Sequence, residues 1–328
     1  MVPALISSGI DYPRTFSEFI TRFNTEDACR AYLEAVRWRD GFVCPRCGVL
    51  GEFWRMNDGL LRCHACRART SVTAGTIFDK TRYPMQTWFH VMWHVVGQKN
   101  GVSALGLQRE IGFGSYQTAW AWMHKLRRAM VNPSRDMIGG YGSTVEVDET
   151  FVGGVTTKAA GGRSVHGKAV VGIAAQSRRS GVVKVRLARL PNTQRDTLTE
   201  FVLDNVARGS KVHTDAWGGY NDLGRYHYEH VITNMSSADA LDAHVTMPAA
   251  HRVASLLKRW LLGTHQGGMS REQLDYYLDE FVFRFNRRSA KSRGLLFYRL
   301  CEGAVATEPR PYKALLTPQM TLKLGDHR

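Results

Sequence analysis

The sequence predicts a mixed α/β chain of the α+β type, in which a cysteine-rich module and a helical region precede a domain built on a sheet. Three observations support this prediction. Two Cys-x-x-Cys pairs lie within residues 44–66, helical periodicity runs from Pro84 to about Met130, and β-rich segments cluster from Val145 onward. The change of periodicity near residue 140 therefore marks the main boundary.

The balance of charge indicates an extended anionic partner. The 328 residues carry a formal net charge of +15, which favours double-stranded DNA. A membrane surface is the rival partner, but no long basic helix with a continuous apolar face is evident. No apolar run approaches the roughly 18 residues of a spanning helix, and the first residues lack the basic region of a signal peptide. We therefore expect a cytoplasmic protein with no membrane segment.

Four of the six cysteines have the spacing of a zinc ribbon. Cys44 and Cys47 are followed, after 15 intervening residues, by Cys63 and Cys66. Four thiolates close a tetrahedral site, so we expect one structural Zn²⁺ that stabilises the module and takes no part in catalysis. A redox role is disfavoured because neither pair opens a βαβ unit. The arginines around the two pairs suit either phosphate contacts or a solvated rim.

The residues before and after this ribbon are predicted to be helical. We expect a helical lead-in at residues 1–40, the zinc ribbon at 41–80 and a helix-turn-helix-like DNA-binding region at 81–132. In the last of these, a Gly-containing turn at residues 112–115 separates two helices, and the second helix carries three predicted DNA contacts. These contacts are Lys125, Arg127 and Arg128. A plain αα-hairpin with a Trp-rich core is the alternative, and the net charge favours DNA binding.

The strands after residue 143 follow a recognisable order. Three β-rich segments at 145–151, 169–175 and 182–190 precede a helix at 197–207 and a fourth strand at 211–214. A three-stranded meander, a helix and a further strand are the order of a ribonuclease H-like fold. In that fold the first and fourth strands are neighbours. We expect this domain to span residues 143–300, with a C-terminal tail at 301–328.

Each of these two strands carries an acidic residue. Asp148 lies among Val145, Val147 and Val152, and Asp215 ends the fourth strand. An ionised carboxylate is costly to bury unless it is paired or holds a metal ion. Two carboxylates brought together in this way are suited to Mg²⁺ or Mn²⁺ and to phosphodiester chemistry. We therefore expect Asp148 and Asp215 to be catalytic metal ligands.

Two helices and a basic segment follow. The first helix, from about Pro248, places His251 and Lys258 on one face. After the second helix, five cations occur with no acid among them between Arg284 and Arg293. A charge run is usually a solvated face, but here we favour a phosphate track. The predicted DNA contacts in this part are Lys258, Arg259, Arg284, Arg287 and Arg288.

Several motifs give the chain a resemblance to a known family. They are residues 148–154, residues 213–215 with Tyr220, residues 257–265 and residues 278–288. With the zinc ribbon and residues 103–130, they make the chain resemble bacterial insertion-sequence DDE transposases that have an N-terminal zinc ribbon and are related to the Merlin elements. The resemblance extends from about residue 15 to residue 300.

The resemblance implies a metal-dependent nuclease and strand transferase that acts on the ends of its own element as a homo-oligomer assembled on DNA. Asp148 and Asp215 match the first two acids of the family's triad. The third acid normally lies seven residues before a Lys or Arg, and the position seven before Lys258 is His251. A neutral imidazole suits Mn²⁺ better than Mg²⁺. Asp242 and Asp239 are nearby acids that are candidates for the same role.

Two alternatives stay open at the level of the sequence. The chain is a DNA-binding regulator or decayed transposase if its catalytic domain is inactive, and the missing third carboxylate favours this reading. It is a zinc-dependent scaffold of a nucleoprotein assembly if it has no chemistry of its own. Metal-dependent nicking of DNA that bears the element's terminal repeats separates the enzyme from both.

Overall fold

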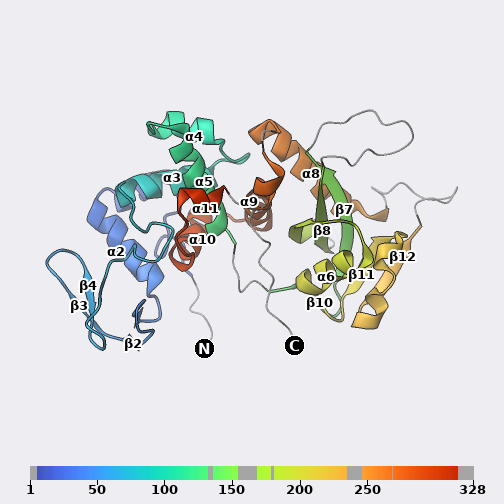
Figure 1. The fold of residues 1–328 in the computed structure, drawn as a ribbon, viewed down its shortest axis with the longest axis horizontal. Coiled ribbons are helices and arrows are strands. Elements are labelled where there is room, and N and C mark those ends of the chain that lie inside the picture. The colour runs from blue at the N-terminus through green and yellow to red at the C-terminus, as the bar shows by residue number, and fades with distance from the viewer. Residues whose placement is uncertain are drawn as a thin grey trace. The chain divides into compact units, whose positions relative to one another are not determined.

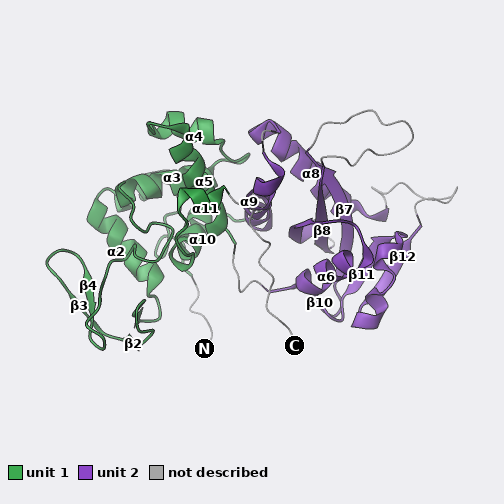
Figure 2. Cartoon of the chain, in the orientation of Figure 1, with its two compact units in different colours: residues 1–132, 289–316 green, residues 133–288, 317–328 purple. Residues whose placement is uncertain are grey.

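The computed structural model describes residues 6–131, 136–153, 168–178, 181–234, 246–267 and 269–316. The chain forms two compact units (Figure 2), the first made of residues 1–132 with 289–316 and the second of residues 133–288 with 317–328. Within the described ranges, every helix is too short or too polar to span a lipid bilayer.

Unit 1 is mainly helical (Figure 1), and aromatic side chains pack together between its helices. They are α1 (Phe16–Arg22), α2 (Glu26–Arg37), α3 (Met85–Gly97), α4 (Ala104–Ile111), α5 (Tyr116–Ala129), α10 (Arg293–Ala306) and α11 (Tyr312–Leu315). Phe19 of α1 is fully buried, and its ring centroid lies 5.1 Å from that of Phe23 and 5.3 Å from that of Phe297 in α10. Segments from opposite ends of the sequence therefore build one core.

A small β module lies between α2 and α3. Its strands are β1 (Phe42–Val43), β2 (Leu50–Gly51), β3 (Phe53–Arg55), β4 (Leu61–Cys63) and β5 (Arg69–Thr70). The first two form a hairpin and the other three form an antiparallel sheet. Phe42 and Leu61 are buried with Cys44 and Cys63. Because so small an apolar core contributes little stability, a metal ion held by the four cysteines would stabilise the module.

The helices α4 and α5 have the order that the sequence predicts. Ser103 and Ser115 cap them by accepting amide hydrogen bonds, and Gly112 ends α4 with a left-handed φ of 75° that a glycine adopts without strain. Trp122 of α5 stacks on Trp88 of α3, with ring centroids 3.5 Å apart. The unit therefore contains both the helix-turn-helix outline and the Trp-rich core of the alternative.

The end of the chain differs from the predicted boundary at residue 300. Residues 289–316 group with unit 1, because α10 packs closely on α5. A Cβ atom on Gly303 would lie 1.8 Å from the carbonyl oxygen of Ala129, so only glycine permits this approach. Local periodicity gives no sign of such long-range packing, and this is why the sequence assigns the first part of α10 to the other domain.

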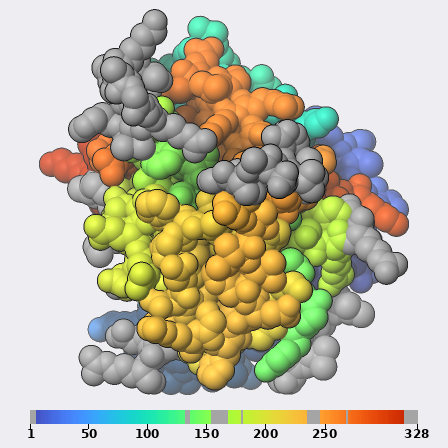
Figure 3. All heavy atoms as spheres, turned by 90° about the vertical axis from the view of Figure 1, so that its right-hand side faces the viewer, coloured from blue at the N-terminus to red at the C-terminus, as the bar shows by residue number. Residues whose placement is uncertain are grey.

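Unit 2 consists of a five-stranded mixed sheet with helices and a separate pair of short strands around it. Its elements are β6 (Ile138–Gly139), β7 (Thr144–Val152), β8 (Ala169–Arg178), β9 (Gly181–Leu190), α6 (Arg195–Asn205), β10 (Val206–Ala207), β11 (Lys211–Asp215), η1 (Gly218–Tyr220), η2 (Leu223–Tyr226), β12 (Glu229–Thr233), α8 (Pro248–His265), η3 (Arg271–Gln273) and α9 (Leu274–Asn286). The strand order is β12-β11-β7-β8-β9. In Figure 3 the segment that contains η1, η2 and β12 covers much of one face of this unit (yellow).

The strand pairings confirm the predicted neighbours. β7, β8 and β9 form an antiparallel meander, and β11 is parallel to both β7 and β12. The first and fourth predicted strands, β7 and β11, therefore lie side by side. This arrangement brings Asp215, at the end of β11, close to Asp148 in the middle of β7, since the two parallel strands start in register.

Helices cover both faces of this sheet. α8 and α9 pack on the face that includes Val171 and Ile173, whereas α6 and η1 pack on the face that includes Val147. Asp148 lies directly opposite Ile173 in the β7–β8 pairing, so it shares the α8 face. Because side chains alternate along a strand, Glu146 lies on this face as well, and Glu149 lies on the other.

Candidate active site and zinc ribbon

The four ribbon cysteines form a cluster of metal-binding geometry. Their sulfur atoms all lie within 4.8 Å of one another, with Cys44 Sγ 3.7 Å from Cys66 Sγ and Cys47 Sγ 3.9 Å from Cys63 Sγ. Tetrahedral bonds of about 2.3 Å to one Zn²⁺ require sulfur atoms about 3.8 Å apart. The predicted grouping of the four cysteines is confirmed, and the site suits one structural zinc ion.

The electrostatics at Cys44 favour a thiolate. Burial opposes its ionisation, but the amide groups of Cys47 and Arg46 donate hydrogen bonds to the sulfur and lower the pKa of Cys44 to about 6. Since the thiolate is the form that binds zinc, these backbone groups prepare the ligand. The backbone of the first Cys-x-x-Cys turn thus contributes directly to the metal site.

The two strand acids lie on one face of the sheet. Lys211 is in register with Thr144 and His213 with Glu146, and the same register carried two residues further aligns Asp215 with Asp148. Asp148 Oδ1 accepts a hydrogen bond of 2.8 Å from the amide of Glu149, and Asp215 Oδ1 accepts one of 3.1 Å from the amide of Trp217. These bonds orient one oxygen of each carboxylate.

His251 lies beside Asp148. It occupies the first turn of α8, and its Nε2 atom is 3.7 Å from Asp148 Oδ2. The side chain of Asp148 is 16% exposed and that of His251 is 37% exposed, whereas the His251 Nε2 atom itself is buried. The structure therefore brings His251 next to the first predicted acid. Asp239 and Asp242 lie outside the described residues.

The proposed ligands Asp148, Asp215 and His251 are of types that bind divalent cations, but they do not converge on a single point. Among the residues that the structure describes, the ribbon cysteines alone form a group of three or more ligating side chains within 4.8 Å. Asp148, Asp215 and His251 are therefore not drawn together around one point. A pair of cations about 3.5–4 Å apart spreads its ligands over such a larger volume. Two carboxylates and an imidazole suit Mn²⁺ or Mg²⁺ in this arrangement.

The carboxyl group of Glu149 lies near Asp148 and Asp215, but on the opposite face of the sheet. Tyr220 of η1 is 1% exposed and donates a 2.7 Å hydrogen bond to Glu149 Oε2. Burial raises the pKa of Glu149 to about 7, and the charges of Asp148 and Asp215 act in the same direction. Tyr220 thereby ties the segment after β11 to the end of β7. The sequence motif contains both residues, but only the fold reveals their bond.

A further buried carboxylate joins the strand to the helix. Glu146 Oε2 accepts hydrogen bonds of 2.8 and 2.9 Å from the amides of Ala249 and Ala250, at the start of α8. Burial raises the pKa of Glu146, and the two amide groups oppose this change. Sequence reasoning missed this residue. Its position two residues before Asp148, on the same face of the strand, was the available signal.

The predicted DNA contacts are placed unequally. Arg127 is 2% exposed, and burial lowers the pKa of Lys125, so neither side chain suits a phosphate contact in this conformation. The side chain of Arg284 is 13% exposed and forms a 2.8 Å ion pair with the buried Glu280. In contrast, Lys258, Arg259 and Arg288 are exposed, and Arg128 and Arg287 are half-buried.

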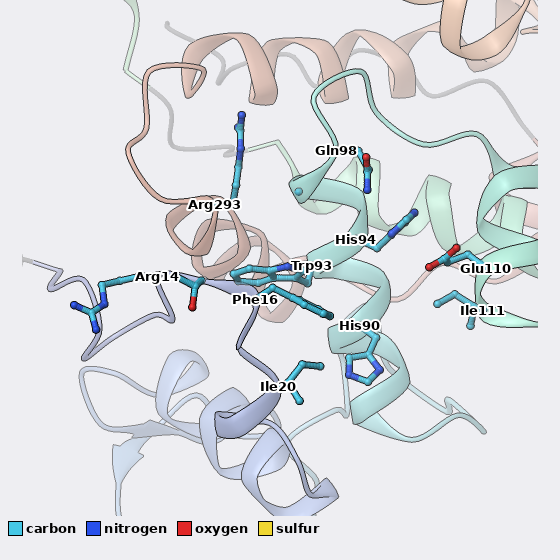
Figure 4. Close-up of a pocket in the computed structure, with 12 residues that line it drawn as sticks. Arg14, Phe16, Ile20, His90, Trp93, His94, Gln98, Glu110, Ile111 and Arg293 are labelled. Carbon is cyan, nitrogen blue, oxygen red and sulfur yellow. The ribbon is translucent and has the colours of Figure 1, made fainter. Parts of the chain in front are cut away.

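Unit 1 also has a surface cavity of about 840 Å³ (Figure 4). Residues of α1, α3 and α4 line it, and Trp93 and Phe16 form its apolar floor. His90, His94 and Glu110 point towards it from α3 and α4. Glu110 is the one carboxylate of this lining. The cavity therefore lacks the acids that phosphodiester chemistry on cations requires.

Two parts of the chain match known protein families. Residues 139–286 match the model of the ISXO2-like transposase domain, and residues 24–69 match that of the transposase zinc-ribbon domain. The chain therefore contains an ISXO2-like transposase domain and a transposase zinc ribbon. A protein of the transposable element ISH50 from Halobacterium salinarum is 24% identical over 287 residues, which cover 81% of this chain and 92% of that protein. The matched domains contain the cysteine cluster and the site around Asp148.

Proposed function

We propose that this transposase binds the terminal repeats of its own element and catalyses metal-dependent strand cleavage and strand transfer. The observation that carries the proposal is the placement of Asp148, Asp215 and His251 on one face of the sheet, with His251 Nε2 3.7 Å from Asp148 Oδ2. The strand order β12-β11-β7-β8-β9 supports a ribonuclease H-like catalytic domain. The relation to Merlin-type elements rests on the sequence resemblance alone.

In this proposal each residue has a defined task. Asp148 and Asp215 would hold Mg²⁺ or Mn²⁺, and His251 would be the third donor. When bound, such ions offset the charge that develops on a phosphodiester and lower the pKa of an attacking hydroxyl. The amides of Glu149 and Trp217 keep the two carboxylates oriented, and the Glu149–Tyr220 bond holds the ends of the strands in place. The protein contributes position and charge, while the DNA supplies the 3′ hydroxyl.

The test uses an oligonucleotide that carries the inverted repeats flanking the reading frame. Wild-type protein should cut it in Mn²⁺ or Mg²⁺. Asn at position 148 or 215 keeps the shape but removes the charge that offsets the cations, so Asp148→Asn and Asp215→Asn should bind this DNA normally and lose cleavage. Failure of the wild-type protein to cut in either metal ion would overturn the enzymatic proposal.

A DNA-binding regulator, or a decayed transposase, is the second candidate. One observation favours it, namely that an imidazole stands where a carboxylate is usual. Specific binding of the repeats without cleavage in either metal ion would support this candidate. Binding with no sequence preference would count against both the enzyme and the regulator. It would instead favour a zinc-dependent scaffold of a nucleoprotein assembly.

We assign sequence recognition to the exposed start of α5. Helix-turn-helix proteins read base edges with the N-terminal residues of their second helix. Tyr116 is 47% exposed, and Gln117 is exposed beside it, whereas Arg127 is buried further along α5. Lys258, Arg259 and Arg288 would supply phosphate contacts on unit 2. Assembly of several subunits on DNA belongs to the same proposal.

A further inference from the structure

The start of α8 is held by a residue of the neighbouring strand. Met247, the residue before this helix, offers no side-chain hydrogen bond to its amides. Glu146 of β7 replaces such a cap, because its Oε2 atom accepts bonds from Ala249 and Ala250. Glu146 is 5% exposed. A carboxylate at a helix N-terminus is stabilised by both the amide groups and the helix dipole.

This link lies between two of the proposed metal ligands. Glu146 is two residues before Asp148 on β7, and Ala250 immediately precedes His251 on α8. The strand and the helix are thus joined by the buried Glu146 carboxylate, close in sequence to Asp148 on the strand and bonded next to His251 on the helix. A shift of the helix start would move His251 relative to Asp148, since no other residue lies between Ala250 and His251.

We propose that Glu146 is a positioning residue, which sets the distance between the His251 imidazole and the Asp148 carboxylate by fixing the start of α8 on β7. The inference rests on the proposed metal site. Glu146 acts through the backbone of α8 and does not itself touch the ion. Partners that orient metal ligands typically affect metal affinity by about 10–100-fold when they are removed.

Two kinds of substitution separate reach from charge. Glu146→Asp keeps the charge but shortens the side chain by one methylene, so the carboxylate reaches α8 only if the helix moves. Glu146→Gln keeps the reach and an oxygen that accepts both amide bonds, but removes the charge. Positioning predicts that the Asp variant is impaired and that the Gln variant is nearly normal. An electrostatic role on the ion predicts the reverse.

The experiment measures Mn²⁺ binding to the full zinc-loaded chain without DNA. The electron paramagnetic resonance signal of the free ion gives the amount that stays unbound. Wild-type protein should bind Mn²⁺, and Asp148→Asn should abolish or strongly weaken this binding. We expect Glu146→Asp to weaken Mn²⁺ binding by about tenfold, as for other residues that orient ligands. Glu146→Gln should stay within about threefold of the wild-type affinity.

A buried acid elsewhere in unit 2 provides the matched control. The side chain of Asp275 is 7% exposed and pairs with Arg189 at 2.9 Å. Asp275→Asn should lower the thermal unfolding midpoint but leave Mn²⁺ affinity unchanged, which distinguishes general destabilisation from positioning. Wild-type affinity in Glu146→Asp, or equal losses in the Asp and Gln variants, would overturn the inference alone. If the wild-type chain shows no Mn²⁺ binding that depends on Asp148, the proposed metal site fails and the inference with it.

Discussion

At the scale of single residues, His251 is the unusual member of the proposed metal site, which contains two carboxylates and an imidazole. An imidazole binds a metal ion as a neutral donor, and that of His251 faces Asp148 at 3.7 Å. A neutral ligand offsets less cation charge than a carboxylate does, so the site should prefer Mn²⁺, which binds imidazole better than Mg²⁺. The departure from the usual acid therefore has a chemical consequence that experiments can measure.

We predict that His251→Ala cripples cleavage and that His251→Glu retains or improves it in Mg²⁺. The carboxylate is the better partner for Mg²⁺. Cleavage of repeat-bearing DNA should be compared in the two metal ions for each variant. Cleavage by His251→Ala at the wild-type rate would show that the third ligand lies elsewhere, and Asp242 would be the next residue to test.

A second prediction concerns the arginines of the zinc ribbon, which are not equivalent. Arg55 is paired with Glu34 at 2.5 Å, and Arg69 is paired with Asp58. The guanidinium of Arg67 instead lies 4.3 Å from the ring centroid of Trp54, and no carboxylate of the described chain lies within ion-pair distance of it. Arg67 is therefore ready to contact phosphate, while Arg55 must first give up its partner.

Arg67→Ala should weaken DNA binding and reduce the slope of log affinity against log salt by about one, the change expected for one phosphate contact. The matched control Arg55→Ala should change the slope much less. Affinities measured across a salt series give both values. An equal change in the two variants would mean that the ion pair does not decide which arginine meets DNA.

At the scale of elements, two histidines form side-chain hydrogen bonds between β11 and β12. His230 Nε2 lies 2.9 Å from Thr214 Oγ1, and His213 Nε2 lies 2.6 Å from Thr233 Oγ1. Burial lowers the pKa of each histidine below 6.5, and for His230 the charge of His213 adds to the effect. The folded state thus favours the neutral imidazoles, whereas the unfolded chain binds protons more readily.

This difference predicts a loss of stability in acid. The contribution of the two histidines is fully present above the unfolded pKa of about 6.5 and is lost as the pH falls through the lower folded values. Urea unfolding of wild-type protein should show a smaller free energy of unfolding at pH 5.5 than at pH 7.5. His230→Gln should show a smaller change over the same range. An identical change in both proteins would contradict the assignment to His230.

Local sequence signals were sufficient for most elements but not for the contacts between them. The Cys-x-x-Cys pairs predicted the sulfur cluster, and the order of strands predicted that β7 and β11 are neighbours, because both depend on spacing along the chain. Glu146 and the packing of α10 depend on which surfaces meet in three dimensions. No periodicity encodes the approach of Gly303 to Ala129, so these features required the structure.

At the scale of the whole molecule, the zinc ribbon and the five-stranded sheet belong to different compact units. Each unit has its own buried core, and the cysteine cluster lies entirely in unit 1. Structural zinc sites contribute on the order of 10–16 kcal/mol to the folding of small modules. Loss of zinc should therefore unfold the ribbon, while the sheet that carries Asp148 and Asp215 keeps its own stabilising contacts.

We predict that Cys63→Ser lowers the zinc content and abolishes specific binding of the terminal repeats, while unit 2 stays folded. Cys63 is 2% exposed in the ribbon core, so its replacement removes both a ligand and a packed side chain. Metal analysis gives the zinc content, and protection of β7 and β8 amides from hydrogen exchange reports on unit 2. Cys29→Ser, which changes a buried cysteine outside the cluster, is the control and should retain zinc. Zinc-free wild-type protein, or loss of amide protection in β7 and β8 of Cys63→Ser, would contradict this division between the two units.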